Sequence, residues 1–355
     1  MLDWLIIGGG IHGVHVAARL IGEADVDVDG IRIVDPGARL LARWRVQTAT
    51  TGMTHLRSPS VHHLDMKPWS LREFAGNPEE RAPGVFAPPL DRPALSLFNA
   101  HSDQVVRRFG LAERHVRARA EASAVDRNAV RVRLSTGREL AARRLVLAVG
   151  ASEQRAWPSW APVAAARIHH IFEPGFDGWP SAPETVAVVG GGISAGQVAL
   201  RLVNEGHRVH LVSRHALRRH QYDWEPGWLG PKRMSAFLDE PCSERRRALV
   251  AAARHRGSVP PDVEVALREA IASEEIRWHE GEVDALARRE GPLQMRFAGG
   301  ATLEVDRVLL ATGFVSKRPG GTLVDRLAAS AALRAAPCGY PIVDAALRWH
   351  RRIYV

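Results

Sequence analysis

Three glycines, Gly8, Gly10 and Gly13, follow an apolar stretch near the start of the chain in the spacing G-x-G-x-x-G. The first permits a tight turn, the second lets the main chain approach a pyrophosphate, and the third lets a helix pack closely. A helix that begins at Ile11 and His12 then offers free N–H groups and the positive end of its dipole to phosphate oxygens. The spacing therefore predicts that these five residues bind a dinucleotide.

An acidic residue stands where such a site needs one. The apolar run 31–34 predicts a second strand, and Asp35 follows it directly. A carboxylate at the end of this strand accepts hydrogen bonds from ribose hydroxyls. Strand, glycine turn, helix, second strand and acid occur in the order of a nucleotide-binding unit, so the glycine pattern does not stand alone.

The same pattern returns in the second half of the chain. A strand over 185–189 leads into Gly190-Gly191-Gly192, a helix follows, and a strand over 208–212 ends at Ser213 and Arg214. Each half also closes with a similar strand, "LVLAVG" ending at Gly150 and "VLLATG" ending at Gly313. Two matched copies indicate two nucleotide-binding domains.

The residues after each second strand predict which nucleotide binds where. Asp35 suits a ribose with free hydroxyls and repels a 2′-phosphate, whereas Ser213 and Arg214, backed by Arg218 and Arg219, suit a 2′-phosphate. We therefore expect FAD in the first domain and NADPH in the second. The expected cofactor-binding residues are Gly8, Gly10, Ile11, His12, Gly13, Asp35, Trp44, Gly150, Gly190, Gly192, Ile193, Ser194, Ala195, Ser213, Arg214, Ala311, Thr312 and Gly313.

The fold class that follows is α/β, with two Rossmann-like three-layer dinucleotide-binding domains that each carry a β-meander insertion. We expect residues 1–160 plus 314–355 to form the FAD domain and residues 161–313 the NAD(P)H domain. The meander strands are predicted at 120–125 and 130–134 in the first half, and at 282–287, 293–297 and 302–305 in the second. A helix is predicted over 96–109.

The catalytic residues are not identified by any pattern. The stretch 40–65 reads as irregular and polar, and it is placed to run along a bound nucleotide, so Gln47, His55 and Arg57 are candidates near the flavin ring. His170 is a further candidate, at a hinge between the domains. Ordinary loop or linker side chains explain each of these residues about equally well.

A competing pattern lies in the second glycine turn. Residues 192–196 fit G-x-S-x-G, the nucleophile elbow of serine hydrolases, with Ser194 as the nucleophile. This alternative leaves the N-terminal copy unexplained.

Composition bounds the remaining choices. The chain has 355 residues and a net charge of +9, but its arginines are spread along its length, so we expect no nucleic-acid partner. We expect no membrane segment, because no apolar run is long enough, and no metal site. The first strand starts too early for a secretory signal, and Cys242 and Cys338 are far apart, which favours the cytoplasm.

The sequence resembles the two-dinucleotide-domain flavoproteins, and within them the N-hydroxylating and Baeyer–Villiger flavin-dependent monooxygenases. Asp306-x3-Leu310-Ala311-Thr312-Gly313-Phe314-x4-Pro319 is similar to the D-x3-L/F-ATGY-x4-H/P motif of the N-hydroxylating enzymes, with Phe in place of Tyr. His170-x3-Pro174 is similar to the second half of the Baeyer–Villiger fingerprint, whose Phe and Gly positions hold Ala164 and Ala166 here.

The resemblance implies an NADPH-dependent flavin monooxygenase that uses molecular oxygen and a flavin C4a-(hydro)peroxide to oxygenate a small amine or ketone. Two alternatives remain open: a flavoprotein reductase that passes electrons to a quinone or carrier protein, and a non-enzymatic nucleotide sensor. In such flavoproteins a strand like the one ending at Val355 leads into a final helix that faces the flavin. We therefore expect a truncated chain, a loosely held FAD, or a protein that has lost oxygenase chemistry. No feature of the sequence predicts the substrate or the oligomeric state.

Overall fold

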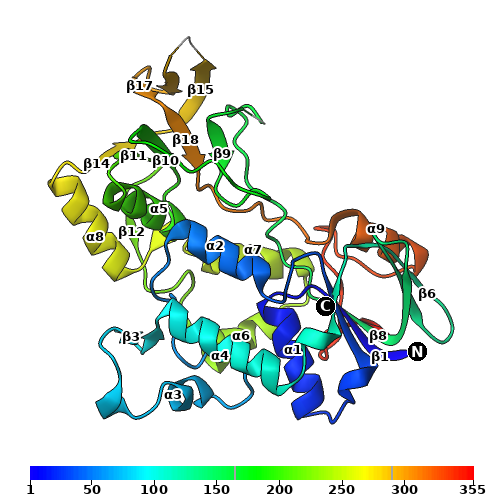
Figure 1. The fold of residues 1–355 in the computed structure, drawn as a ribbon. Coiled ribbons are helices and arrows are strands. Elements are labelled where there is room, and N and C mark those ends of the chain that lie inside the picture. Colours follow the sequence, from blue (N-terminus) through cyan, green and yellow to red (C-terminus); the bar gives the residue numbers. More distant parts are fainter. Residues whose placement is uncertain (164, 289–290) are drawn as a thin grey trace. The chain divides into compact units, whose positions relative to one another are not determined.

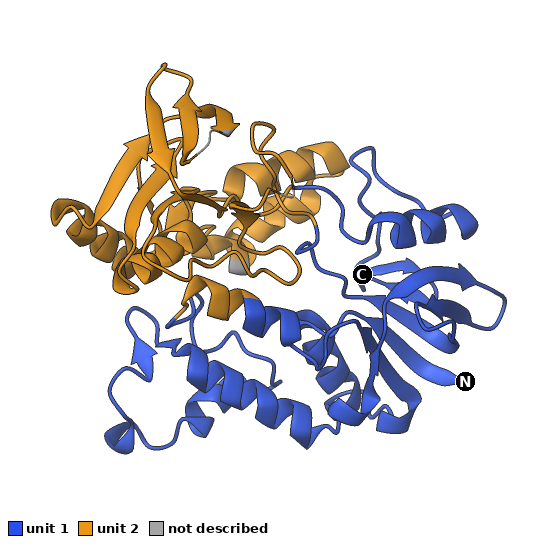
Figure 2. Ribbon diagram, turned by 45° about the horizontal axis from the view of Figure 1, so that its top comes forward, with its two compact units in different colours: residues 1–46, 54–153, 316–355 blue, residues 47–53, 154–315 orange. Residues whose placement is uncertain are grey.

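The computed structural model describes residues 1–163, 165–288 and 291–355. The chain divides into two compact units, which are coloured separately in Figure 2. Unit 1 comprises residues 1–46, 54–153 and 316–355, and unit 2 comprises residues 47–53 and 154–315. None of the helices in the described ranges is long and apolar enough to cross a membrane.

Unit 1 is built on an eight-stranded sheet (Figure 1). Its main path runs β19-β20-β8-β1-β2-β5, and β1 pairs in parallel with both β2 and β8. The antiparallel strands β6 and β7 join through β8. The bounds are β1 (Leu2–Ile7), β2 (Ile31–Asp35), β5 (His115–Arg117), β6 (Ala120–Val125), β7 (Val130–Leu134), β8 (Glu139–Leu147), β19 (Arg348–His350) and β20 (Ile353–Tyr354), with a separate hairpin of β3 (Phe86–Ala87) and β4 (Arg92–Pro93).

The alternation of side chains along β1 explains the layers of unit 1. Leu5 and Ile7 belong to a core cluster with the meander residues Val130 and Val132, and with α9. Ile6 is also fully buried, and its side chain points to the opposite face of the sheet. The helices are α1 (Ile11–Gly22), α3 (Ser70–Phe74), α4 (Leu95–Arg108) and α9 (Gly321–Ser330); α2 (Ala42–Thr51) begins in unit 1, and its residues 47–51 belong to unit 2.

Unit 2 repeats this plan around an all-parallel sheet in the order β14-β11-β10-β18-β9. The strands are β9 (Ile168–His170), β10 (Thr185–Val189), β11 (Arg208–Ser213), β14 (Ile276–Glu280) and β18 (Arg307–Leu310). Val186 and Val188 pack with α5 and α8, whereas Ala187, between them, packs with the meander. The remaining elements are β12 (Arg218–Arg219), β13 (Ser258–Val259), the meander β15 (Val283–Arg288), β16 (Leu293–Phe297) and β17 (Thr302–Val305), α5 (Ile193–Asn204), α6 (Pro231–Asp239), α7 (Ser243–Ala253) and α8 (Pro261–Ala272).

The predicted fold class is confirmed, since each unit has a helix layer, a parallel sheet and a meander. The prediction that residues 40–65 are irregular is wrong for residues 42–51, which form α2. The sequence of α2 has no apolar stripe, because its buried side chains are the threonines Thr48 and Thr51. Helical periodicity of apolar residues therefore gave no signal there.

Candidate functional site: two glycine turns

The first glycine turn connects β1 to α1 in unit 1. Gly8 has φ +112°, and a Cβ there would lie 2.2 Å from the carbonyl oxygen of Ala148. A Cβ on Gly13 would lie 1.8 Å from the carbonyl oxygen of Gly8. By contrast, a Cβ on Gly10 would meet no atom within 4 Å. Gly8 and Gly13 are thus required by packing within the protein, and Gly10 leaves open space over the turn.

The start of α1 is suited to an anion. Gly10 is the N-cap residue, no side chain caps the helix, and its first turn, with Ile11 and His12, has no acidic residue. The N–H groups there keep their hydrogen-bonding capacity, and the helix dipole adds a positive potential. A pyrophosphate fits this arrangement.

Asp35 lies at the end of β2, as predicted, and its carboxylate is held by the turn itself. Oδ2 accepts a hydrogen bond from the N–H of Gly9 at 2.8 Å, and Oδ1 accepts one from the N–H of Gly37 at 2.8 Å. Each carboxylate oxygen can accept a second hydrogen bond. The carboxylate is therefore oriented by the main chain and retains capacity for ribose hydroxyls.

The second glycine turn connects β10 to α5 and repeats the first in detail. A Cβ on Gly190 (φ +152°) would lie 2.5 Å from the carbonyl oxygen of Ala311, the counterpart of Ala148. Gly192 is the N-cap of α5, which has neither a capping side chain nor an acidic residue in its first turn at Ile193 and Ser194. Ala195 replaces the third glycine and is 1% exposed. Unit 2 thus has a second site suited to a pyrophosphate.

The "LVLAVG" and "VLLATG" segments pack against the two glycine turns through the carbonyl oxygens of their alanines. The carbonyl oxygens of Ala148 and Ala311 face Gly8 and Gly190, and a glycine with positive φ follows each strand by three residues, +61° at Gly150 after β8 and +73° at Gly313 after β18. The hydroxyl of Thr312 donates to the carbonyl oxygen of Ala156. The sequence repeat therefore corresponds to one contact that occurs twice, between an alanine carbonyl oxygen and the first glycine of each turn.

The end of β11 carries the predicted 2′-phosphate residues. Ser213 is 2% exposed, its Oγ donates to the carbonyl oxygen of His215 at 2.8 Å, and it accepts from Nε1 of Trp278 at 2.9 Å. The hydroxyl proton of Ser213 is therefore already used in a hydrogen bond within the loop. Arg214 is exposed, as are Arg218 and Arg219 on β12. The structure leaves the arginines as the accessible cationic groups at this strand end.

His170 is a buried, neutral histidine. Its Nε2 donates to the carbonyl oxygen of Gly313 at 3.2 Å, and its Nδ1 accepts from the N–H of Phe172 at 3.2 Å. Burial lowers the pKa of His170 to about 4, although the hydrogen bond to Gly313 raises it. Both ring nitrogens are used, so the geometry favours support of the Gly313 turn over proton transfer. Ala164, from the same fingerprint, lies outside the described residues, and Ala166 accepts a hydrogen bond from His169.

The other candidates near the flavin ring are divided between the two units. Gln47 belongs to unit 2, whereas His55 and Arg57 belong to unit 1. Nε2 of His55 donates to the carbonyl oxygen of Gly84 at 2.7 Å and so fastens the proline-rich loop 76–93. Trp44, predicted to bind the cofactor, donates from Nε1 to Oδ1 of Asn99 at 3.1 Å. Its indole N–H is thus used in packing on α4.

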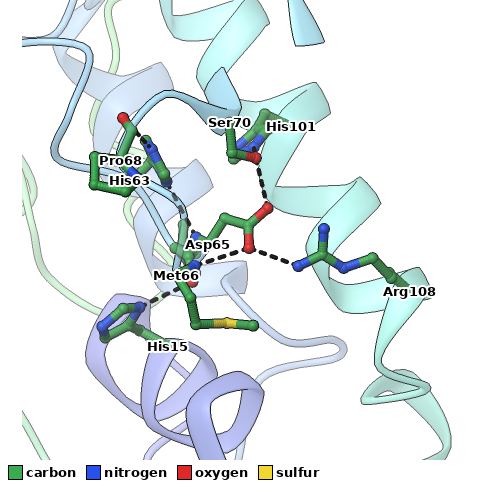
Figure 3. A network of polar contacts seen from close by, with 9 residues as sticks. His15, His63, Asp65, Met66, Pro68, Ser70, His101 and Arg108 are labelled. Carbon is green, nitrogen blue, oxygen red and sulfur yellow. Dashed lines mark hydrogen bonds and ion pairs between the residues drawn. The ribbon is translucent and has the colours of Figure 1, made fainter. Parts of the chain in front are cut away.

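The same polar stretch contains a network that the sequence did not reveal (Figure 3). The side chain of Asp65 is 1% exposed and accepts hydrogen bonds from Arg108 at 2.5 Å and from Oγ of Ser70 at 2.5 Å. Ser70 also contacts Nε2 of His101, which is fully buried, at 2.8 Å. Burial alone would raise the pKa of Asp65, but these hydrogen bonds lower it to about 2.

This network does not have the geometry of a catalytic triad. Ser70 lies between the acid and the histidine, whereas a triad needs the histidine between the acid and the serine. Ser194, the alternative nucleophile, has no hydrogen bond to a histidine among residues 1–163, 165–288 and 291–355. The structure therefore offers no support for the serine hydrolase alternative.

The middle glycine of each turn, Gly9 and Gly191, makes contacts that the sequence pattern did not predict. Gly9 donates to Asp35, and a Cβ on Gly9 would lie 2.8 Å from the side chain of Leu40. A Cβ on Gly191 would lie 2.8 Å from the ring of His215. The pattern G-x-G allows any residue at the middle position. The one sequence feature that could have indicated these contacts is that both copies have a glycine there. His215 also lies against Gly257, which is far away in the sequence.

Comparison with known proteins agrees with this geometry. Residues 5–152 match a protein-family model described as FAD-NAD(P)-binding. No match is found among curated proteins. The whole chain is similar to the solved structure of an ornithine N-hydroxylase, KtzI, from Kutzneria sp. 744, with a TM-score of 0.79, 16% identity and coverage of 100% of this chain and 91% of that one.

Two further solved structures share the fold. The cadaverine monooxygenase DfoA of Erwinia amylovora matches with a TM-score of 0.75, 15% identity and coverage of 100% of this chain and 87% of that one. The bacillithiol disulfide reductase Bdr of Bacillus cereus matches with a TM-score of 0.63, 18% identity and coverage of 99% and 89%. The predicted resemblance to two-dinucleotide-domain flavoproteins is thus confirmed at the level of the fold.

Proposed function

We propose that this chain is an FAD-dependent, NADPH-using monooxygenase that oxygenates a small amine. The two glycine turns carry the proposal, because they repeat one geometry with an acid after the first and arginines after the second. The structures of the ornithine and cadaverine enzymes support the choice of an amine over a ketone. We further propose that unit 1 binds FAD, that unit 2 binds NADPH, and that the protein is cytoplasmic.

The residues of unit 1 fit FAD. The N–H groups at the start of α1 would bind its pyrophosphate, the open space over Gly10 would admit it, and Asp35 would accept from the adenosine ribose. When bound, FAD supplies hydride acceptance and oxygen activation, which no side chain of the chain supplies.

The residues of unit 2 fit NADPH. The start of α5 would bind its pyrophosphate, and Arg214 with Arg218 and Arg219 would bind the 2′-phosphate through charge-assisted hydrogen bonds. Ser213 would act indirectly, since its hydroxyl fixes the loop at His215 from which Arg214 extends. The role of these residues is to bind and orient the nucleotide.

The test is the absorption spectrum of the purified chain, followed by single turnover under labelled oxygen. We expect a bound flavin that NADPH bleaches, and an amine product that carries label from O₂. Bleaching followed by stoichiometric peroxide release with every amine tried would favour the reductase, a function known for the Bacillus cereus protein of this fold. A colourless protein that does not bind added FAD would leave only a nucleotide sensor.

A further inference from the structure

A cavity of about 420 Å³ lies in unit 1, at the start of β1. It is lined by Met1, Asn128, Arg143, Arg144, Arg351 and Arg352. The glycine turn that we assign to FAD follows the opposite end of β1, after Ile7. A strand rises about 3.3 Å per residue, so the six residues of β1 separate the two places by roughly 17–20 Å. The cavity is therefore distinct from the FAD site.

The charge of this cavity is not balanced by the protein. Of its four arginines, Arg143 forms an ion pair with Asp3 at 3.2 Å. The nearby carboxylates of Asp126 and Glu139 are both paired with Arg131. Within the described part of the chain, the guanidinium groups of Arg144, Arg351 and Arg352 have no ion pair.

These guanidinium groups are held in place by contacts that carry no negative charge. Arg352 donates to the carbonyl oxygens of Arg143 at 3.2 Å and Arg127 at 2.8 Å, and Arg351 donates to that of Arg127 at 3.1 Å. The guanidinium of Arg144 lies over the ring of Trp4, 5.1 Å from its centroid. Nε of Arg352 is buried and has no hydrogen-bond partner in the described structure. The site is thus preorganised by contacts that leave its positive charge uncompensated.

We propose that this arginine pocket binds a small molecule that carries a multiply charged phosphate group. The planar fork of a guanidinium matches phosphate oxygens, and several such groups around one cavity favour a polyanion over a single carboxylate. The volume lies in the range of small-ligand sites. An adjoining cavity contains Arg32 and Arg138 together with Asp29 and Glu139, so the excess positive charge does not continue as the track that a nucleic acid needs.

Isothermal titration of the full chain with inorganic pyrophosphate tests the proposal, with one equivalent each of FAD and NADP⁺, which fill the glycine turns without free nucleotide that could enter the arginine pocket. We expect one site per chain whose affinity falls as salt is added. Arg351→Gln with Arg352→Gln should weaken pyrophosphate about tenfold or more, a change of about 1.4 kcal/mol or more. Arg326→Gln, an exposed residue of α9 outside the cavity, removes one positive charge, as Arg144→Gln does, and is the control for a general loss of charge; it should bind like the native chain.

Arg144→Gln keeps the test decisive if the double variant fails to fold, because this side chain makes no main-chain hydrogen bond among the described residues. It too should weaken pyrophosphate. Equal affinity in the native chain and in Arg144→Gln would overturn the proposal. So would citrate binding as tightly as pyrophosphate, or a short single-stranded oligonucleotide binding more tightly than both. Loss of flavin binding alone would refute the proposed function and leave this site standing.

Discussion

A Cβ on Gly13 would lie 1.8 Å from the carbonyl oxygen of Gly8, whereas one on Gly10 would meet no atom within 4 Å. Gly13→Ala should therefore lower the free energy of unfolding by about 1–3 kcal/mol, the cost of overpacking. Gly10→Ala should leave the stability of the FAD-free chain unchanged but weaken FAD about tenfold or more, because its methyl group enters the space that a pyrophosphate needs.

Urea unfolding and flavin fluorescence titration measure the two effects separately. Ala195→Gly is the control for FAD binding. It changes only the second turn, where it introduces the glycine that the first turn has at Gly13. If Gly10→Ala binds FAD as tightly as the native chain, the assignment of the first turn to a pyrophosphate is wrong.

Arg214→Ala tests the choice of NADPH. Arg214 is exposed directly after β11, and an arginine there distinguishes a 2′-phosphate from a hydroxyl. We expect NADPH binding to fall about tenfold or more, with NADH nearly unchanged. Flavin reduction rates at varied nucleotide concentrations give both affinities. Arg296→Ala, which removes an arginine paired with Asp284 on the meander, should affect neither nucleotide. An equal loss for both nucleotides in Arg214→Ala contradicts the assignment.

His101 should make unit 1 sensitive to acid. Burial, together with a smaller effect of the neighbouring His63, lowers the pKa of His101 from 6.5 to about 4. Since the folded pKa lies below the unfolded one, this contribution to stability is complete above pH 6.5 and is lost as the pH falls towards 4. A glutamine does not titrate in this range. Between pH 7.5 and pH 5, the free energy of unfolding of His101→Gln should therefore fall by about 1–2 kcal/mol less than that of the native chain. Urea unfolding of both chains at the two pH values is the measurement. Equal losses in the native chain and in His101→Gln would refute the role of His101.

Asp65 should contribute in a lower pH range. Its pKa is lowered to about 2, so its contribution is complete above pH 4 and is lost as the pH falls towards 2. Asp65→Asn should cost about 1–3 kcal/mol at pH 7, because Arg108 and Ser70 lose the carboxylate acceptor. Asp25→Asn, at an exposed position after α1, is the matched control and should leave the urea midpoint nearly unchanged. Equal midpoints for both variants would show that the network in Figure 3 does not stabilise the loop.

His170→Asn tests whether the buried histidine transfers protons. Because the two ring nitrogens bond to the main chain at Gly313 and at Phe172, we expect lower stability but an unchanged dependence of kcat on pH between about 6 and 8. Steady-state oxygen consumption over this range is the measurement. Loss of one limb of the pH profile would instead restore His170 as a catalytic residue.

The sequence predicted the elements whose signal is local. Glycines at Gly8 and Gly190 mark tight turns, and strict alternation marked the strands 130–134 and 293–297, which the structure has at the same residues. Helix α2 was missed because it buries threonines and has no apolar stripe. The contacts of Gly9 and Gly191 were missed because a consensus pattern treats the middle position as free.

The spacing of residues along the chain predicted two units with the same strand, glycine turn and helix, with an acid after one second strand and arginines after the other, because such spacing sets local geometry. Which polar side chains are available for chemistry depends on the tertiary structure. Ser213, His170 and Trp44 are engaged by residues far from them in the sequence or by the main chain. The same is true of the arginine pocket, whose members come from β8 and from the turn before β20. Hydrogen bonds and charge balance depend on which strands lie side by side, and no local spacing records that.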